Sequence, residues 1–430
     1  MTGPTNMRFS ILLALVVVGA AQAQQTMHLT LADAQGLAIR NNPQFSAAKY
    51  TAAAANQVPN QYRAAMQPNL SGNLTAVGAD NGSRIAAGGL TNPVVYDHLG
   101  SGLTISQLIT DFGRTSNLVG MAKLQAAAQD QFTEATRADI LLATSNAYFA
   151  VLSARAVLQV VDETVKARQT VVDQVTALAE SKLRSTLDVS FANVNLSGAK
   201  LLQVQAQNEL QAAEAQLATA MGLPGGAVFV LADEPMPPVL ADRVQDLIDA
   251  AIQNRPELKD LRLQQNAAER FAKAEHALYF PTVGVLGAAG FAPAAEAQIP
   301  GRYGAIGMNI SIPIFNGGLF KSRQTEAELK AKAAGATVTD QQNSIIRDVR
   351  IAYLNATTAY DRMALTQGLL QQAQLAMDLS QNRYDLGLAA IVELSQAQLN
   401  LTSAQIANTT ARYDYQAQHI DVDFQTGTLH

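Results

Sequence analysis

The segment Ala38-Ile39-Arg40-Asn41-Asn42-Pro43 returns in altered form as Ala251-Ile252-Gln253-Asn254-Arg255-Pro256, 213 residues later, which shows that the chain contains a duplication. Further along the chain, equivalent residues stand 205 apart, for example Tyr148 and Tyr353. The offset changes only between residues 68 and 106. A duplication that changes length at one point marks that point as a loop and the rest as a framework. A single doubling of about 200 residues predicts pseudo-symmetric assembly around an axis.

The amino terminus predicts export from the cytoplasm. Arg8 precedes an apolar run at 11–18, and Ala21-Gln22-Ala23 offers a small-residue cleavage site. Because this run is too short for a mature membrane helix, we interpret residues 1–23 as a secretory signal peptide rather than a buried helix. The chain has no cysteine. We therefore expect neither a lipid anchor on the mature amino terminus nor a disulfide framework.

Composition and motif content argue against several classes of protein. The formal net charge of -5 argues against a nucleic-acid binder, which would normally show a basic patch. The five histidines form no closely spaced ligand pair, and the sequence has neither a Gly-rich phosphate loop nor a nucleophile elbow. We therefore expect no enzyme activity, no cofactor and no metal site.

The distribution of proline predicts very long helices. None of the 14 prolines falls between Pro93 and Pro224 or after Pro313. Helices of about 65 residues would be about 100 Å long, too long for a compact domain. Each carries a stripe of residues spaced by seven, which predicts a coiled-coil-like seam. The stripes are Val151, Leu158, Val165, Val172 and Ala179, and Val349, Ala356, Met363, Leu370, Met377 and Tyr384.

Each long helix is predicted to turn back at an equivalent place. Ser185 can cap a new helix and Asp188, three residues later, can complete a capping box. In the second copy, Gly387 suits a left-handed turn at a helix end. These signals predict two unequal helical hairpins, with tips near 182–188 and 384–393.

Four segments of about ten residues alternate apolar and polar side chains, at about 69–79, 98–108, 281–291 and 303–313. This is the length of a tilted strand that crosses a bilayer, although a soluble antiparallel sheet shows the same alternation. An exported chain with no other membrane element favours membrane strands. We expect Leu103, Ile105, Met308 and Ile310 to face lipid, with hairpin loops at 79–97 and 292–302 outside the cell.

Four strands cannot close a barrel, and open strand edges in lipid cost several kcal/mol per unpaired group. The chain must therefore oligomerise if its strands span a membrane. Two chains would give eight strands and an interior filled by side chains, whereas three would give twelve strands and room for a lumen.

The duplicated Ala-Ile-x-Asn-x-Pro openings, the segment Ser311-Ile312-Pro313-Ile314-Phe315-Asn316-Gly317-Gly318 and the tip Arg383-Tyr384-Asp385-Leu386-Gly387-Leu388 resemble the TolC family of outer-membrane efflux proteins. The resemblance covers the whole mature chain. It implies a mostly α-helical homotrimer, in which a twelve-stranded β-barrel continues into a twelve-helix tunnel. The structural repeats would be 24–222 and 246–427, joined by an equatorial linker at 223–245 and followed by a tail at 428–430.

The resemblance also implies location and partners. The barrel would be integral to the outer membrane of a Gram-negative cell, surrounded by its lipid, with the helices in the periplasm. A periplasmic adaptor protein and an inner-membrane pump of the RND, ABC or MFS type would deliver cargo to the helical tips. The function implied is an exit duct for efflux or type I secretion.

Two groups of tip residues carry roles implied by the resemblance. The positions expected to constrict the entrance are Tyr384, Asp385, Glu393, Asp188 and Arg184. The positions expected to contact the adaptor are Gly387, Leu388, Ala389, Lys182, Leu183 and Ser185.

This chain departs from the family pattern at the tips. Lys182 stands where a glycine is expected, and Gln396 replaces an acidic residue. Ala389 replaces an arginine, although Arg184 occupies the equivalent first-copy position. A plainer interpretation is that the tip residues are solvated helix caps. The alternative function is a secreted or surface-attached trimeric stalk without transport.

Overall fold

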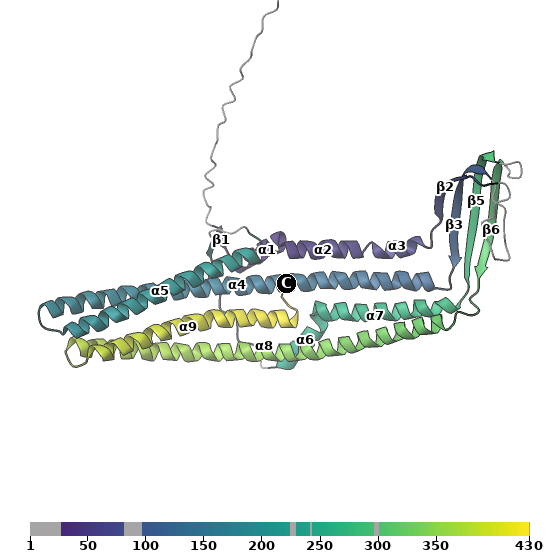
Figure 1. The fold of residues 1–430 in the computed structure, drawn as a ribbon. Helices are drawn as coiled ribbons and strands as arrows, with labels where there is room; N and C mark the ends of the chain where they lie inside the picture. Colours follow the sequence, from purple (N-terminus) through teal and green to yellow (C-terminus); the bar gives the residue numbers. More distant parts are fainter. Residues whose placement is uncertain (1–26, 81–96, 224–228, 241–242, 296–300, 430) are drawn as a thin grey trace, which may run out of the picture.

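The computed structural model describes residues 27–80, 97–223, 229–240, 243–295 and 301–429. These form a long bundle of helices with a small sheet at one end (Figure 1). The predicted signal peptide, most of the 79–97 loop and His430 of the tail lie outside the described residues.

The two predicted hairpins are present. The long helices α4 (Arg114–Glu180) and α8 (Leu319–Asp385) have 67 residues each, about 100 Å of helix. They turn back into α5 (Thr186–Ala220) and α9 (Ile391–Thr426). Around the middle of the molecule the four helices lie side by side in the order α5, α4, α9, α8 (Figure 1). Closer to the tips α5 crosses α4 and also contacts α9.

The predicted seams account for the packing of these long helices. Every residue of the two seven-residue stripes is buried or half-buried, as expected for a coiled-coil-like contact. The most apolar window of α4 has the length and composition of a membrane span. However, 44% of that window is buried inside the chain, as in the core helix of a bundle.

Shorter helices flank the long ones on the side of the sheet. The first repeat has α1 (Leu31–Asn41), α2 (Pro43–Ala55) and α3 (Val58–Ala64). The second has α6 (Val244–Asn254), α7 (Pro256–His276) and a 3-10 turn, η1 (Ala277–Tyr279). The repeated Asn-x-Pro sequence ends one helix and starts the next in both copies, because the residue before proline is extended and proline suits the first helical turn.

The sheet has the antiparallel order β2-β3-β5-β6. Its strands are β2 (Asn69–Val77), β3 (His98–Thr110), β5 (Thr282–Ala295) and β6 (Arg302–Ser311). The fourth strand was predicted to end at about residue 313, but β6 ends two residues earlier, at Ser311. Pro313 has no amide proton to donate to a neighbouring strand. Conversely, β5 continues to Ala295, into the segment that we interpreted as loop.

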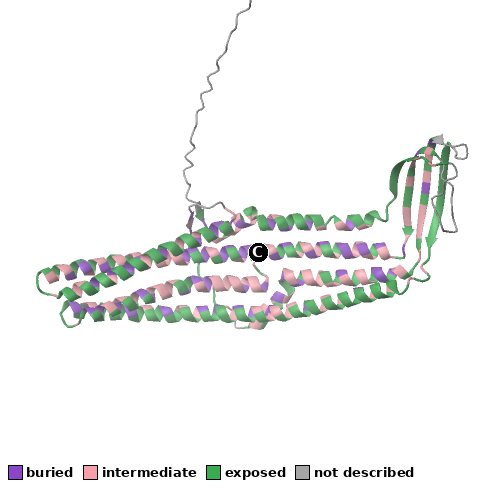
Figure 2. Cartoon of the chain, viewed as in Figure 1, coloured by how far each residue is buried: buried purple, intermediate pink, exposed green. Residues whose placement is uncertain are grey.

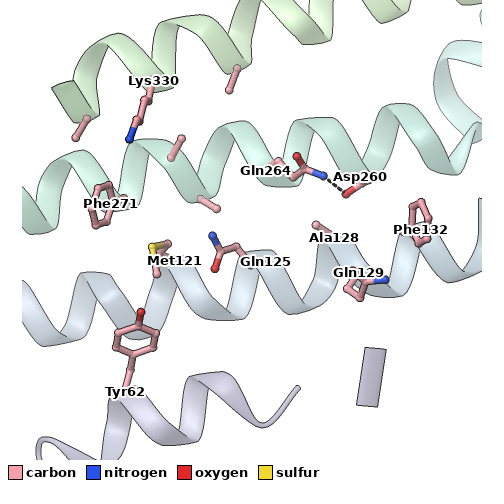
Figure 3. A pocket seen from close by; sticks show the side chains of 14 residues that line it. Tyr62, Met121, Gln125, Ala128, Gln129, Phe132, Asp260, Gln264, Phe271 and Lys330 are labelled. Atoms are coloured by element: carbon pink, nitrogen blue, oxygen red, sulfur yellow. Dashed lines mark hydrogen bonds between the residues drawn. The ribbon is translucent and has the colours of Figure 1, made fainter. Parts of the chain in front are cut away.

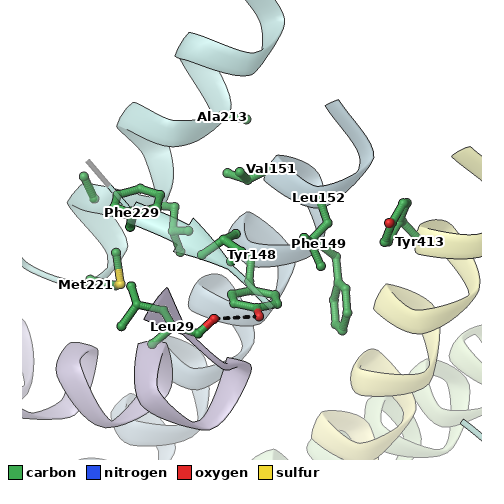
Figure 4. Close-up of a cluster of buried hydrophobic side chains, with 13 residues drawn as sticks. Leu29, Tyr148, Phe149, Val151, Leu152, Ala213, Met221, Phe229 and Tyr413 are labelled. Carbon is green, nitrogen blue, oxygen red and sulfur yellow. Dashed lines mark hydrogen bonds between the residues drawn. The ribbon is translucent and has the colours of Figure 1, made fainter. Parts of the chain in front are cut away.

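A second, two-stranded sheet, which no pattern in the sequence predicts, lies in the middle of the molecule. Strands β1 (Met27–Leu29) and β4 (Phe229–Leu231) pair in parallel halfway along the bundle. The hydroxyl of Tyr148 on α4 lies 3.1 Å from Leu29 O and 2.6 Å from Ala232 O, beside a cluster of buried apolar side chains (Figure 4). Residues 27–29 and 229–232 are thereby attached to the middle of α4.

Candidate functional site

The register of the four-stranded sheet separates its side chains into two faces. Paired residues on neighbouring strands point to the same side, and side chains alternate along each strand. One face is largely apolar, with Ser101, Gln107 and Arg302 as its polar members; its apolar residues are Leu70, Leu74, Ala76, Leu103, Ile105, Val283, Val285, Ala289, Phe291, Ile306, Met308 and Ile310. The other face also carries Val77, His98, Leu108 and Leu286 but is largely polar or small: Asn69, Ser71, Asn73, Thr75, Gly102, Thr104, Ser106, Thr282, Gly284, Ala288, Gly290, Tyr303, Ala305, Gly307, Asn309 and Ser311.

The apolar face is uncovered by the rest of the chain (Figure 2). The four residues expected to face lipid, Leu103, Ile105, Met308 and Ile310, all lie on it and are 44% to 68% exposed. An apolar face of this extent in water would cost roughly 25 cal/mol for each Å². The sheet is therefore suited to contact an apolar phase with one face and water with the other.

The two hairpin tips have the same backbone geometry. In the first tip Lys182 N donates to Ala179 O and Leu183 N to Leu178 O; in the second, Gly387 N donates to Tyr384 O and Leu388 N to Arg383 O. Lys182 and Gly387 both have positive φ, of 60° and 74°. The first tip therefore forms the left-handed turn without its glycine, at a cost of about 1 kcal/mol or more.

One pair of predicted entrance residues joins the two hairpins. Arg184 in the first tip donates from Nη2 to the carbonyl oxygen of Tyr384 at 2.6 Å, and its guanidinium lies 4.2 Å from the centre of the Tyr384 ring. A cation at the last carbonyls of α8 also favours the helix dipole. Tyr384 is only 4% exposed, and burial raises the pKa of its phenol. Its Oη has no hydrogen-bond partner among the described residues.

The other predicted entrance residues make local contacts. Glu393 forms an ion pair with Arg383 across the second tip, with Nε and Oε1 3.1 Å apart. Asp385 accepts from Gln381 at 3.0 Å, and Asp188 completes the capping box with Ser185. We had not identified Arg383 as a site residue, although its place ten residues before Glu393 on a turn was a usable signal.

The residues expected to contact an adaptor lie at the ends of the hairpins. Leu183 and Leu388 are 72% and 69% exposed. Lys182 and Ser185 are also exposed, and Ala389 is half-buried. Leu386, which we had not proposed, is equally exposed at 74%. Each tip therefore presents an apolar end to solvent.

A layer of polar side chains lies between the hairpins, farther from the tips. Arg168 of α4 is 6% exposed and donates from Nη1 to Asn195 O at 2.9 Å, and the Asn195 amide donates to Ser395 Oγ of α9 at 2.6 Å. Burial lowers the pKa of the Arg168 guanidinium. The apolar seven-residue pattern gave no sign of this layer.

An open groove of about 670 Å³ crosses α3, α4, α7 and α8 (Figure 3). Alanine and glutamine dominate its lining, and Asp260 accepts from Gln264 there at 2.8 Å. It contains no pair of groups arranged as nucleophile and base. Within the described ranges, no three His, Cys, Asp or Glu side chains are placed to hold a metal ion.

Comparison with known proteins identifies the family. The family model for outer membrane efflux proteins matches residues 35–223 and 247–428. The chain belongs to the outer membrane efflux protein family. The outer membrane protein TolC of Escherichia coli is 24% identical over 442 residues, which cover 97% of this chain and 86% of TolC. The alkaline protease secretion protein AprF of Pseudomonas aeruginosa is 23% identical, over 93% of this chain and 85% of AprF.

A solved structure shows the same fold. The outer membrane protein VceC of Vibrio cholerae superposes with a TM-score of 0.79 at 20% sequence identity, covering 92% of this chain and 96% of VceC. The predicted resemblance is therefore confirmed. As a member of this family, the chain is a transport protein of the Gram-negative outer membrane and not an enzyme.

Proposed function

We propose that three copies of this chain form one export duct, with a twelve-stranded barrel in the outer membrane continuous with a twelve-helix tunnel across the periplasm. The observation that carries the proposal is the two-faced sheet, which ends in two unpaired edge strands at one end of helices about 100 Å long. Lipid would contact the apolar face and water in the lumen would contact the polar face.

The number of strands supports the trimer. Strands β2 and β6 are the edges of the sheet, and each has unpaired backbone groups. Pairing β6 of one copy with β2 of the next would satisfy these groups and continue the same two faces around a closed barrel. A dimer would close eight strands without space for a lumen, whereas a trimer leaves one.

The helices also have two unpartnered edges. Around the middle of the bundle the outermost helices are α5 and α8 (Figure 1). Exposed apolar residues recur along both, at Leu187, Phe191, Val194, Leu201 and Val204 on α5 and at Ile351, Leu354, Leu365, Leu369, Leu375 and Leu379 on α8. Packing α5 of one copy against α8 of the next is a head-to-tail contact, which closes a ring when its rotation divides the circle.

The hairpin tips are proposed as the periplasmic entrance. Arg184 and Tyr384, with Asp188, Asp385 and Glu393 around them, would hold the tips together in the closed state. The exposed apolar ends of the tips, among them Leu183 and Leu388, would contact a periplasmic adaptor. Cargo would enter from an inner-membrane pump of the RND, ABC or MFS type.

The polar face of the barrel gives a first indication of the cargo. Among its paired residues in the described strands there is no Asp, Glu, Lys or Arg. A wall of hydroxyl, amide and small side chains favours passage of cargo of either charge. This wall is compatible with both drug efflux and the protease secretion named for AprF.

Electron microscopy of the detergent-extracted full-length protein tests this proposal. We expect a hollow, tapered cylinder with threefold symmetry, longer than the roughly 100 Å of the helices. Fractionation of cells supplies a second test, since the barrel should leave the envelope with detergent and not with high salt. Solid rods or release by salt would instead support a stalk, although a stalk does not explain the exposed apolar face of the sheet.

A further inference from the structure

A tyrosine lies flat on the polar face of the sheet. The register pairs Tyr303 of β6 with Gly290 of β5, and Gly290 with Gly102 of β3. A methyl group on Gly290 would lie 2.5 Å from Cζ and Oη of Tyr303, and a methyl group on Gly102 would overlap the same hydroxyl. The phenol ring therefore rests across two neighbouring strands, in a space that exists only because both positions are glycine.

Tyr303 is unusual among its neighbours on this face. The other paired residues of the polar face in the described strands are mostly Gly, Ala, Ser, Thr and Asn; Tyr303 is the only Phe, Tyr or Trp among them, and the one other ring is the imidazole of His98 at the first residue of β3. It is 47% exposed. It also lies next to the first residue of β6, at the end of the sheet away from the helices.

We propose that Tyr303 sets the bore of the barrel near its outer mouth, and that Gly102 and Gly290 keep the ring flat so that the bore stays wide. The inference rests on the proposed function, in which the polar face lines the lumen. Three copies would place three rings around the mouth. If the ring were displaced from its place over Gly102 and Gly290, it would project farther into the lumen than any aliphatic side chain on this face.

A purely structural role is the competing interpretation, since an aromatic ring over glycine also stabilises a strand pair. The two roles differ in what happens when the ring is displaced. A structural role predicts a change in stability alone. A role in the bore predicts a change in which molecules can pass, and removal of the ring should reverse that change.

Accessibility of an introduced cysteine provides the test, because the native chain has none. Ser106→Cys places a thiol on the polar face, four residues from Gly102 toward the helices. Gly78→Cys, just beyond the outer end of β2, is the matched control. Intact cells are treated with maleimides that carry polyethylene glycol chains of graded length, and labelling rates are compared for native Gly102, Gly102→Ala, and Gly102→Ala with Tyr303→Ala.

Gly102→Ala is chosen because the added methyl group meets chiefly the mobile end of a side chain, whereas one at Gly290 would also overlap the carbonyl oxygen of Ser101. We expect Gly102→Ala to slow labelling of Ser106→Cys by the longer reagents on the order of tenfold, and the added Tyr303→Ala to restore it. Labelling of Gly78→Cys should not change. If the Gly102→Ala variant fails to insert into the outer membrane, Tyr303→Trp can replace it, because it enlarges the ring without altering the glycines. We expect Tyr303→Trp to slow labelling of Ser106→Cys by the longer reagents in the same way.

The outcomes separate this inference from the proposed function. Unchanged labelling of Ser106→Cys in every ring variant would refute the role of Tyr303 and leave the duct intact. If no reagent, however small, reaches Ser106→Cys from outside while Gly78→Cys is labelled, there is no open lumen and both proposals fail.

Discussion

Replacing Arg184 with alanine should open the periplasmic entrance. The side chain makes two contacts with the second hairpin: a hydrogen bond of 2.6 Å to Tyr384 O and a cation–π contact at 4.2 Å. A cation–π contact at a partly exposed site contributes about 0.5–1 kcal/mol, and a hydrogen bond from a charged donor about 1.5 kcal/mol. Loss of about 2 kcal/mol per protomer shifts a closed-to-open equilibrium roughly thirtyfold.

Single-channel recording in planar bilayers measures this shift. We expect a higher open probability for Arg184→Ala than for the native protein, with Arg184→Lys between them because lysine keeps the charge but loses the planar stack. Arg362→Ala is the matched control, since Arg362 pairs with Asp414 at 3.0 Å within one hairpin and does not join the two.

A double substitution that keeps the net charge of the tips distinguishes the effect of the Arg184–Tyr384 contact from the effect of the arginine charge. Arg184→Ala combined with Ala389→Arg keeps one arginine at the tips but moves it to the second hairpin. If closure depends on the contact with the end of α8, the swap should remain open. Native open probability in Arg184→Ala would refute the reasoning, and closure in the swap would show that only the charge matters.

Three further substitutions test the tips and the attachment of β1 and β4 to α4. Lys182→Gly should stabilise the protein by about 1 kcal/mol, seen as a higher denaturation midpoint, because it removes a side chain from a left-handed position. Tyr384→Phe should not raise the open probability at neutral pH, since the buried Oη has no partner among the described residues. Because burial raises the pKa of Tyr384, its contribution to stability is complete below about pH 10, the unfolded value, and is lost above it; Tyr384→Phe should lack this loss in denaturation measured against pH. Tyr148→Phe should cost about 1–2 kcal/mol and speed proteolysis of the segment around β4, because its hydroxyl contacts Leu29 O and Ala232 O.

The long helices and their turns could be predicted because their signals are local. Absence of proline, the capping box of Ser185 and Asp188, and the glycine at 387 each act within a few residues. The positive φ of Lys182 is different, because lysine alone does not indicate the left-handed region and only its equivalence to Gly387 marks the position. Duplication therefore supplied information that single-position propensity lacked.

The remaining features depend on contacts between distant segments. Strands β1 and β4 have three residues each, which is too few for a recognisable alternation, and they pair across about 200 residues of sequence. Arg184 and Tyr384 are likewise 200 residues apart in the sequence, and they meet because the two hairpins pack side by side. The end of β6 was misplaced because apolar alternation continued past the last residue that could pair.

The tips show how a duplicated chain becomes functionally asymmetric. Their backbones are equivalent, yet Arg184 faces its partner hairpin from the first tip while Ala389, its second-copy equivalent, has no charged group to offer in return. The end of α8 is therefore held by the other hairpin, whereas the end of α4 has no equivalent clamp from residue 389. Loss of the Arg184 contact should therefore free the end of α8 from the first tip, and no contact from residue 389 would replace it.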